Sequence, residues 1–256
     1  VLPPNWGDYS REMQSRLLFE GSFFPGGHKD LDYFFYEYRV HHVAQFTREV
    51  AEAVHKVRPR TEFSAAVFKN PIQSGRFIGQ DWRRFSPWVQ YLMPMDYRSH
   101  YAGDFETHLE LLAESIQQQK SWARDFPHLW IGVAAYQLYD EERRFISELR
   151  RLLSSGRPSP GFQAAFDKVA ARLRTLAPDV HAAVVSYARE PKAGSELASR
   201  LGAFVKSPPP GYYPPERLLK TLDVVRGQDV EGVVVFSTSG LTSSSLWDAL
   251  GRFFAQ

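Results

Sequence analysis

The chain has 256 residues, of which 43% are hydrophobic and 23% are charged, and its formal net charge is +2. These values describe an ordinary globular protein, exclude a long disordered chain, and argue against a dedicated nucleic-acid binder, which carries a strongly basic face. The sequence contains no cysteine, so disulfides, thiolate catalysis and cysteine-ligated zinc are excluded. No apolar run approaches the roughly 20 residues that span a bilayer, so we expect no membrane-spanning helix.

Helical and extended patterns alternate along the chain. Its opening, Val1-Leu2-Pro3-Pro4, resembles the exit from a strand into a loop, so we expect a fragment or a processed product. Apolar residues at three- and four-residue steps predict helices over 9–19, 32–57, 105–124, 141–153, 162–176, 215–226 and 246–254. Short aliphatic runs predict strands over 63–68, 89–96, 129–136 and 232–237. Proline and glycine mark breaks at 23–28, 154–161 and 208–211.

This order predicts an α/β protein with a parallel sheet, because each helix must cross over and pack back on the sheet. Four strands do not close a barrel of eight, so both an open sheet and part of a barrel fit the pattern. We expect βα units over 1–154, an inserted helical or linker segment over 155–213, and a last βα unit of the same barrel over 214–256.

The segment 88–97 is the most informative part of the chain. It predicts a buried strand that ends on Asp96-Tyr97, and parallel α/β barrels place their active sites at such strand ends. Pro94 cannot donate to the sheet, so the pairing should loosen just before Asp96. Asp96 is therefore a candidate catalytic carboxylate, and the alternative is that it caps the following helix.

Other candidate site residues lie near the same strand ends. Asp81 is a second catalytic candidate, with an N-cap role before Trp82-Arg83-Arg84 as its alternative. Aromatic rings stack on the apolar faces of sugars, which makes Tyr97, Tyr101 and Tyr136 candidates for substrate binding, whereas core packing is the alternative. The run 140–142 is acidic and starts a helix, where the dipole favours it, although one of its carboxylates could face the cleft.

Other motif classes find little support. The adjacent His41 and His42 diverge on a helix and cannot chelate one metal, so no metal or other cofactor is predicted. Ser237-Thr238-Ser239-Gly240 follows a strand and resembles a phosphate-binding turn, but no P-loop or dinucleotide fingerprint accompanies it. No Gly-x-Ser-x-Gly elbow is present, which argues against a serine hydrolase.

Four segments together resemble the family-ten glycosyl-hydrolase-like proteins, which are (β/α)8-barrel glycosidases of bacterial envelopes. The segments are 63–68, Gly79-Gln80-Asp81-Trp82, Tyr91-Leu92-Met93-Pro94-Met95-Asp96-Tyr97 and 232–237. The resemblance covers about residues 6–150 and 212–254 and implies that the four strands are strands five to eight of a TIM-type barrel. The segment 1–4 then lies where the fourth strand ends, so a further acidic residue is expected upstream of Val1.

The resemblance implies a glycoside hydrolase that acts on an extracellular or cell-envelope polysaccharide by carboxylate chemistry. Asp96 and Asp81 would be catalytic, and Tyr97, Trp82, Tyr101 and Tyr136 would bind the substrate. The alternative is a non-catalytic carbohydrate-binding or structural protein on the same scaffold. In either case we expect a carbohydrate ligand, no nucleic acid, no cofactor, and an upstream half of the barrel or a partner chain that completes the sheet.

Overall fold

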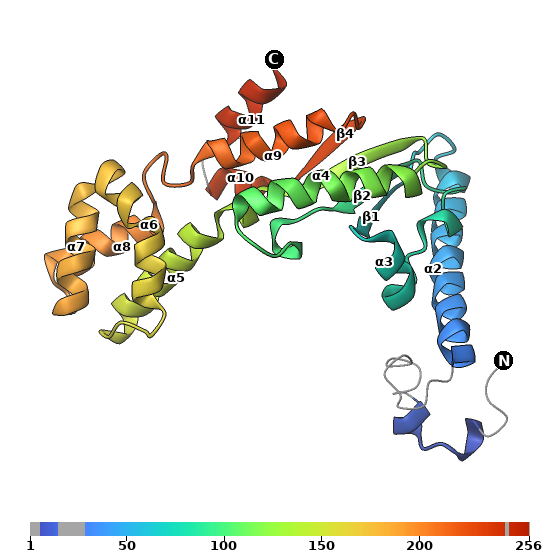
Figure 1. The fold of residues 1–256 in the computed structure, drawn as a ribbon, viewed down its shortest axis with the longest axis horizontal. Coiled ribbons are helices and arrows are strands. Elements are labelled where there is room, and N and C mark those ends of the chain that lie inside the picture. Colours follow the sequence, from blue (N-terminus) through green and yellow to red (C-terminus); the bar gives the residue numbers. More distant parts are fainter. Residues whose placement is uncertain (1–5, 15–28, 244–245, 256) are drawn as a thin grey trace. The chain divides into compact units, whose positions relative to one another are not determined.

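The computed structural model describes residues 6–14, 29–243 and 246–255 (Figure 1). Of the helix predicted over 9–19 it describes the helical turn at 11–14, which follows the 3-10 helix η1 (Trp6–Asp8). The break predicted at 23–28 lies outside the described residues. Among the helices described, none combines the length and apolarity needed to cross a bilayer.

Helices and strands alternate as predicted, with additional α-helices in three places, namely α3, the pair α7 and α8, and α10. The α-helices are α2 (Lys29–Val57), α3 (Pro71–Ile78), α4 (Phe105–Trp122), α5 (Asp140–Ser155), α6 (Phe162–Leu176), α7 (Pro178–Arg189), α8 (Glu196–Lys206), α9 (Pro215–Gly227), α10 (Thr238–Ser243) and α11 (Trp247–Phe254). The strands are β1 (Ser64–Phe68), β2 (Tyr91–Met95), β3 (His128–Ala134) and β4 (Gly232–Phe236). Short 3-10 helices are η3 (Trp82–Arg84), η4 (Arg98–His100) and η5 (Ala135–Tyr139).

The four strands form one parallel sheet in the order β1-β2-β3-β4, which confirms the predicted parallel α/β arrangement. β1 pairs with β2 along its whole length, from Ser64↔Tyr91 to Phe68↔Met95. The pairing of β2 with β3 skips Met93 and Pro94 and resumes at Met95↔Gly132. Proline has no N–H to donate, so the ladder is interrupted where the sequence predicted it.

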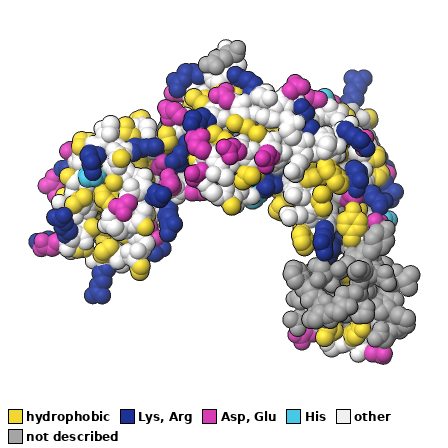
Figure 2. Space-filling view, in the orientation of Figure 1, with side chains coloured by type: hydrophobic (Ala, Val, Ile, Leu, Met, Phe, Trp, Pro, Cys, Tyr) yellow, Lys and Arg dark blue, Asp and Glu magenta, His cyan; other side chains and the backbone are white. Residues whose placement is uncertain are grey.

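The chain divides into two compact units, and the division passes through β3, β4, α4 and α9. The first unit takes in the residues up to Asp96 together with Glu110–Val133 and Val225–Val234. Its core contains Val67, Trp82, Phe85, Val89, Leu92, Ala123 and Phe126. Large apolar side chains of α2 and α3 also reach the surface, where Figure 2 shows hydrophobic groups in yellow. The apolar surface of this unit is therefore only partly covered.

Helix α3 was not predicted, and three local signals delimit it. Asn70 caps its start, since the side chain accepts a hydrogen bond from the N–H of Gln73 at 2.9 Å, and Pro71 occupies the first turn. Gly79 ends the helix in the left-handed region at φ 76°, where a Cβ would lie 2.7 Å from the carbonyl oxygen of Arg39. Glycine is therefore required where α3 meets α2.

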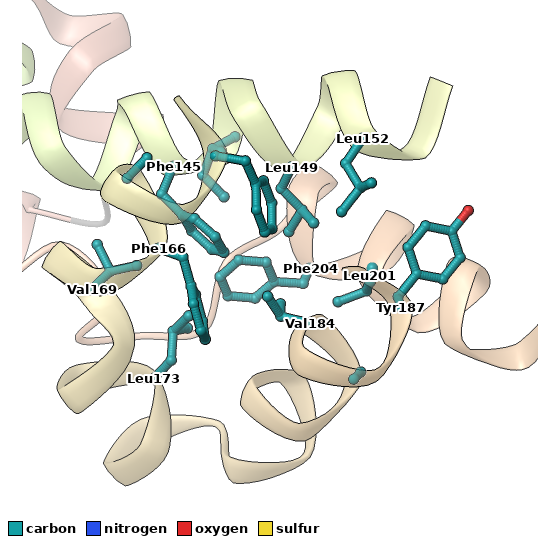
Figure 3. Packing of buried hydrophobic residues seen from close by; sticks show 14 of the residues in the cluster. Phe145, Leu149, Leu152, Phe166, Val169, Leu173, Val184, Tyr187, Leu201 and Phe204 are labelled. Atoms are coloured by element: carbon teal, nitrogen blue, oxygen red, sulfur yellow. The ribbon is translucent and has the colours of Figure 1, made fainter. Parts of the chain in front are cut away.

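The second unit contains Tyr97–Leu109, Ala134–Val224 and the residues from Val235 onward. Within it, α5, α6, α7 and α8 enclose a core of their own (Figure 3). Phe145 of α5 is fully buried against the rings of Phe162, Phe166 and Phe204. The insertion expected over 155–213 thus consists of three helices, and the preceding helix α5 packs into the same core.

Candidate functional site

A pocket of about 450 Å³ lies where the parallel strands end. Its lining residues, all in the second unit, are Tyr97, Tyr136, Arg143, Phe236, Ser237, Ser239 and Gly240. Tyr97 follows β2, Tyr136 belongs to η5 directly after β3, and Phe236 is the last residue of β4. The carboxyl ends of parallel strands are where α/β proteins build binding sites, so this pocket is the candidate functional site.

Aromatic side chains form one wall of the pocket. The Tyr97 ring meets the Phe236 ring edge-on at 5.5 Å between centroids and stacks on His100 at 5.4 Å. Burial, and then the neighbouring Tyr136, raise the pKa of the Tyr97 phenol above its ordinary value. A tyrosine phenol is protonated at neutral pH even at its ordinary pKa of about 10, so Tyr97 can donate a hydrogen bond to a ligand.

The polar part of the pocket lining consists of serine hydroxyl groups and one cation. The Ser237 and Ser239 hydroxyls are 2.8 Å apart, and the N–H of Gly240 donates to Ser237 Oγ at 3.4 Å. The Arg143 guanidinium lies over the Tyr136 ring at 5.7 Å. A Cβ on Gly240 would lie 3.0 Å from Cβ of Tyr136, so a side chain there would press on the tyrosine.

Asp96 is buried beside the sheet rather than exposed in this pocket, with 1% of its surface accessible. Gln119 of α4 donates from Nε2 to Oδ1 and Oδ2 of Asp96 at 3.1 and 2.9 Å, and the Ser115 hydroxyl donates to Oδ1 at 3.1 Å. The Asp96 N–H donates to the carbonyl of Gly132 in β3 at 2.8 Å. Asp96 thus ties the end of β2 to the middle of α4 and to β3, a contact that neither predicted role described.

Lys69, which directly follows β1, is a titratable group that the sequence reasoning did not single out. Burial lowers the pKa of its ammonium, and the negative charge of Asp96 acts in the opposite direction. The carbonyl of Lys69 accepts a hydrogen bond from Gln119 Nε2 at 2.9 Å. A lysine and a carboxylate therefore lie at the ends of adjacent strands in the first unit, joined through one buried amide.

Asp81 and Trp82 lie in the core of the first unit. Asp81 is 4% exposed and caps η3, because it accepts hydrogen bonds from the N–H and guanidinium of Arg83 at 3.2 Å. The Tyr36 phenol, whose pKa is raised to about 12 by burial, donates to Asp81 at 2.8 Å. Burial alone would raise the pKa of Asp81, but these bonds lower it below its ordinary value. The structure supports the alternative N-cap role of Asp81.

Two of the aromatic residues predicted to bind substrate are covered by protein atoms. Trp82 has no accessible surface. The neighbouring Arg83 guanidinium lies over the ring of Trp122. Tyr101 is 8% exposed and packs against His108 at 4.9 Å between ring centroids. Their rings are core side chains, since no face of Trp82 and little of Tyr101 is open to a ligand. Of the predicted binding residues, the structure brings Tyr97 and Tyr136 together in one pocket.

The acidic run at the start of α5 serves a neighbouring site in the same unit. Asp140 and Glu141 line a pocket of about 270 Å³ with Arg98 and Arg217. Burial raises the pKa of Asp140. Glu142 is 2% exposed and pairs with Arg172 at 3.0 Å and with Arg217 at 3.2 Å. Two of the three carboxylates, Asp140 and Glu141, thus face a cavity, and that cavity is separate from the tyrosine pocket.

The site carries no arrangement typical of a metal centre, since no group of three or more His, Asp or Glu residues is placed to hold an ion within the described ranges. No protein-family model, no curated protein and no solved structure matches the chain. The fold and the pocket therefore define only a structural class, which is an α/β protein with an aromatic and hydroxyl-lined pocket at the carboxyl ends of parallel strands.

Proposed function

We propose that the chain supplies strands five to eight of a TIM-type (β/α)8 barrel, whose other half comes from upstream residues or a partner chain. The sequential, parallel strand order supports this arrangement. β1 and β4 are the outer strands, and every residue of β4 is only half-buried. Parallel sheets are normally covered on both faces and their edges protected, so the partly covered strands favour a further βα layer.

The exposed apolar residues beside β1 support the same proposal. Phe68 at the end of β1 is 47% exposed, and Ile72 and Phe77 of α3 are more exposed still. Large exposed apolar patches mark surfaces that another element covers. A further barrel strand beside β1, with the helix that packs on it, would cover these side chains.

The proposed function is saccharide binding at the tyrosine pocket, with an extracellular or cell-envelope polysaccharide as the ligand. The observation that carries it is the grouping of Tyr97 and Tyr136 with serine hydroxyls at the strand ends. Aromatic rings pack on the C–H faces of sugar rings, while hydroxyl and phenol groups exchange hydrogen bonds with sugar hydroxyls. The resemblance of the strand segments to barrel glycosidases favours the same ligand class.

Hydrolysis is the second candidate function, and the position of Asp96 at the end of β2 favours it. Cleavage requires two carboxyl groups about 5–5.5 Å apart for retention or roughly 6.5–9.5 Å apart for inversion. Asp and Glu are absent from the lining residues named for the tyrosine pocket, and Asp96 is engaged by Gln119 and Ser115. The residues proposed to bind saccharide all line the tyrosine pocket, whereas hydrolysis would also require carboxylates from outside this pocket.

Saccharide binding is testable by calorimetric titration of the whole chain with a panel of bacterial envelope and extracellular polysaccharides. For any polysaccharide of the panel that binds, Tyr97→Ala and Tyr136→Ala should each weaken binding by about tenfold or more. Loss of a buried aromatic anchor commonly costs ~2 kcal/mol. The matched control is Tyr38→Ala, because Tyr38 is an exposed tyrosine of α2. Equal loss in all three variants, or no ligand in the panel, would contradict the proposal.

Hydrolysis is testable by the release of reducing ends from the same ligands. If Asp96 is an acid or base, Asp96→Asn should lower turnover by at least about 10²-fold. Asp96 also anchors β2, so the variant should lose about 1–3 kcal/mol of stability, and the assay must run where both proteins are folded. Unchanged turnover together with a lower Tm would make Asp96 a purely structural residue.

A further inference from the structure

A groove of about 610 Å³ lies on the helical segment, between α6 and α7. This volume is in the range of pockets that hold small ligands. The floor consists of Phe162, Phe166 and Val184, which are at most 8% exposed, and Figure 3 shows Phe166 and Val184 in the core of this segment. Val185 and Ala188 of α7 line the groove as half-buried residues. A ligand here would therefore remove further apolar surface from water, which favours binding.

The uncharged polar side chains of the groove already have partners within the protein. The Ser159 hydroxyl donates a hydrogen bond to the carboxylate of Glu148. The Gln163 amide donates to Asp167 at 2.7 Å. Two further lining residues are prolines, which have no N–H to donate. A polar ligand would find few partners here, and each buried polar group without a partner costs free energy. The lining therefore favours a ligand that is apolar along most of its length.

Arg189, the last residue of α7, is the charged residue of this lining. It is exposed, and within the described ranges its guanidinium has neither a hydrogen bond nor an ion pair. The adjacent Glu190 pairs with Lys192 at 3.1 Å. Glu148 pairs with Arg151 at 3.4 Å. Arg189 is therefore a cation that a ligand can reach, and the planar fork of its guanidinium matches a carboxylate.

An acyl chain suits this lining better than a peptide does. Each residue of an extended peptide carries an N–H and a C=O group, and both need partners when they are buried. The groove offers few such partners, because its serine and glutamine donate to carboxylates and its prolines have no donor. An acyl chain is polar only at its carboxylate end, which would meet Arg189.

We infer that this groove binds a medium-chain fatty acid. The acyl chain lies against Phe166, Val185 and Ala188, and the carboxylate accepts hydrogen bonds from the guanidinium of Arg189. The inference goes beyond the proposed saccharide binding and is independent of it, because the groove and the tyrosine pocket share no lining residue among those described.

The test is titration of the whole chain with butanoate, hexanoate and octanoate, followed by NMR of the backbone amides. Each fatty acid is used below the concentration at which it forms micelles. We expect the affinity to rise by about threefold or more for each added methylene group, since each is removed from water. The amide shifts should change in 158–166 and 184–189.

The role of the charge is tested with 1-octanol, which has the same chain without a carboxylate, and with variants of the exposed Arg189. Arg189→Gln should weaken octanoate binding by about threefold or more and leave 1-octanol binding unchanged. Arg189→Lys should keep part of the octanoate affinity. The matched control is Arg174→Gln, which removes an exposed arginine of α6 and should change neither affinity.

Several outcomes would overturn the inference. One is that the folded chain binds no octanoate, or binds it with an affinity that does not rise with chain length. Equal binding of 1-octanol and octanoate, or an equal loss in Arg189→Gln and Arg174→Gln, would remove the role of the cation. Amide shifts confined to 97–101 and 135–143 would place the fatty acid in the tyrosine pocket instead. A dimer in light scattering that Val185→Glu converts to a monomer would make the groove an interface between copies of the chain.

Discussion

The helical segment α5–α8 and the parallel sheet differ in how completely they bury their own apolar side chains. In the helical segment, aromatic and aliphatic residues of all four helices meet in one core (Figure 3). In the first unit, a smaller core under the sheet coexists with exposed large side chains on β1, α2 and α3. The helical segment therefore buries most of its large apolar side chains in its own core, whereas several large apolar side chains of the first unit stay exposed.

This difference in burial predicts which side chains determine the stability of the chain and which ones form a surface that can be covered. A side chain in the filled helical core affects packing, since every neighbour would have to relax around a cavity. An exposed apolar side chain beside the sheet contributes little to the chain's own stability and matters for what covers it. Substitutions in the helical core should therefore lower the free energy of unfolding far more than substitutions of exposed apolar residues beside the sheet.

The largest expected effect is that of Phe145→Ala. Phe145 is fully buried among three other phenylalanine rings, so its loss should cost about 3–5 kcal/mol of unfolding free energy. Phe46→Ala, at a phenylalanine of α2 that is 68% exposed, should change stability by less than about 0.5 kcal/mol. Urea unfolding followed by circular dichroism measures both, and similar costs would remove the distinction between the two regions.

A second comparison uses two glycines that end helices in the left-handed region, one in each unit. Gly156→Ala after α5 has open space around the new Cβ, so only the backbone cost of about 1–2 kcal/mol applies. Gly79→Ala after α3 adds a clash with the Arg39 backbone and should cost more, because α2 or α3 must move. Unfolding free energies check the order, and an equal cost would mean that the α2–α3 contact yields without penalty.

Asp81→Asn should change stability by an amount that depends on pH. The folded-state pKa of Asp81 is lowered, so its stabilisation is fully present above the unfolded pKa of about 3.9 and is lost as pH falls through the folded value. The variant should be about 1–3 kcal/mol less stable at neutral pH, and the difference should shrink below about pH 4. Unfolding midpoints across this range test it, with Asp223→Asn on the exposed side of α9 as control; a difference independent of pH would contradict the ionised Asp81.

Local sequence patterns predicted the order and direction of the strands and the long helices α2 and α6, because these depend on periodicity within one segment. Helix α3 was missed because eight residues give only two turns, although Asn70, Pro71 and Gly79 carried its boundaries. α7 and α8 were missed inside the expected insertion. Their apolar faces have meaning only against α5 and α6, with which they share a core.

The candidate site was predictable only in part. The ends of the strands identified Tyr97 and Tyr136, since parallel strands bring their carboxyl ends together. The burial of Asp96 depends on Gln119 and Ser115, which are 23 and 19 residues away along the chain, and no local pattern conveys such contacts. Arg143 was overlooked within an acidic helix start, and the turn Ser237–Gly240 was noted only as similar to a phosphate-binding turn, although both line the pocket with the two tyrosines.

The central claim is that the saccharide ligand binds at the strand ends and not on the helical segment. Hydrogen exchange of the whole chain, with and without a polysaccharide that binds, tests this claim most directly. The helical segment offers the contrasting site, a groove of about 610 Å³ between α6 and α7 lined by Phe162, Phe166 and Val184. We predict ligand-induced protection in 97–101, 135–143 and 236–241, with the segment 158–189 unchanged. Protection confined to 158–189 would contradict the account.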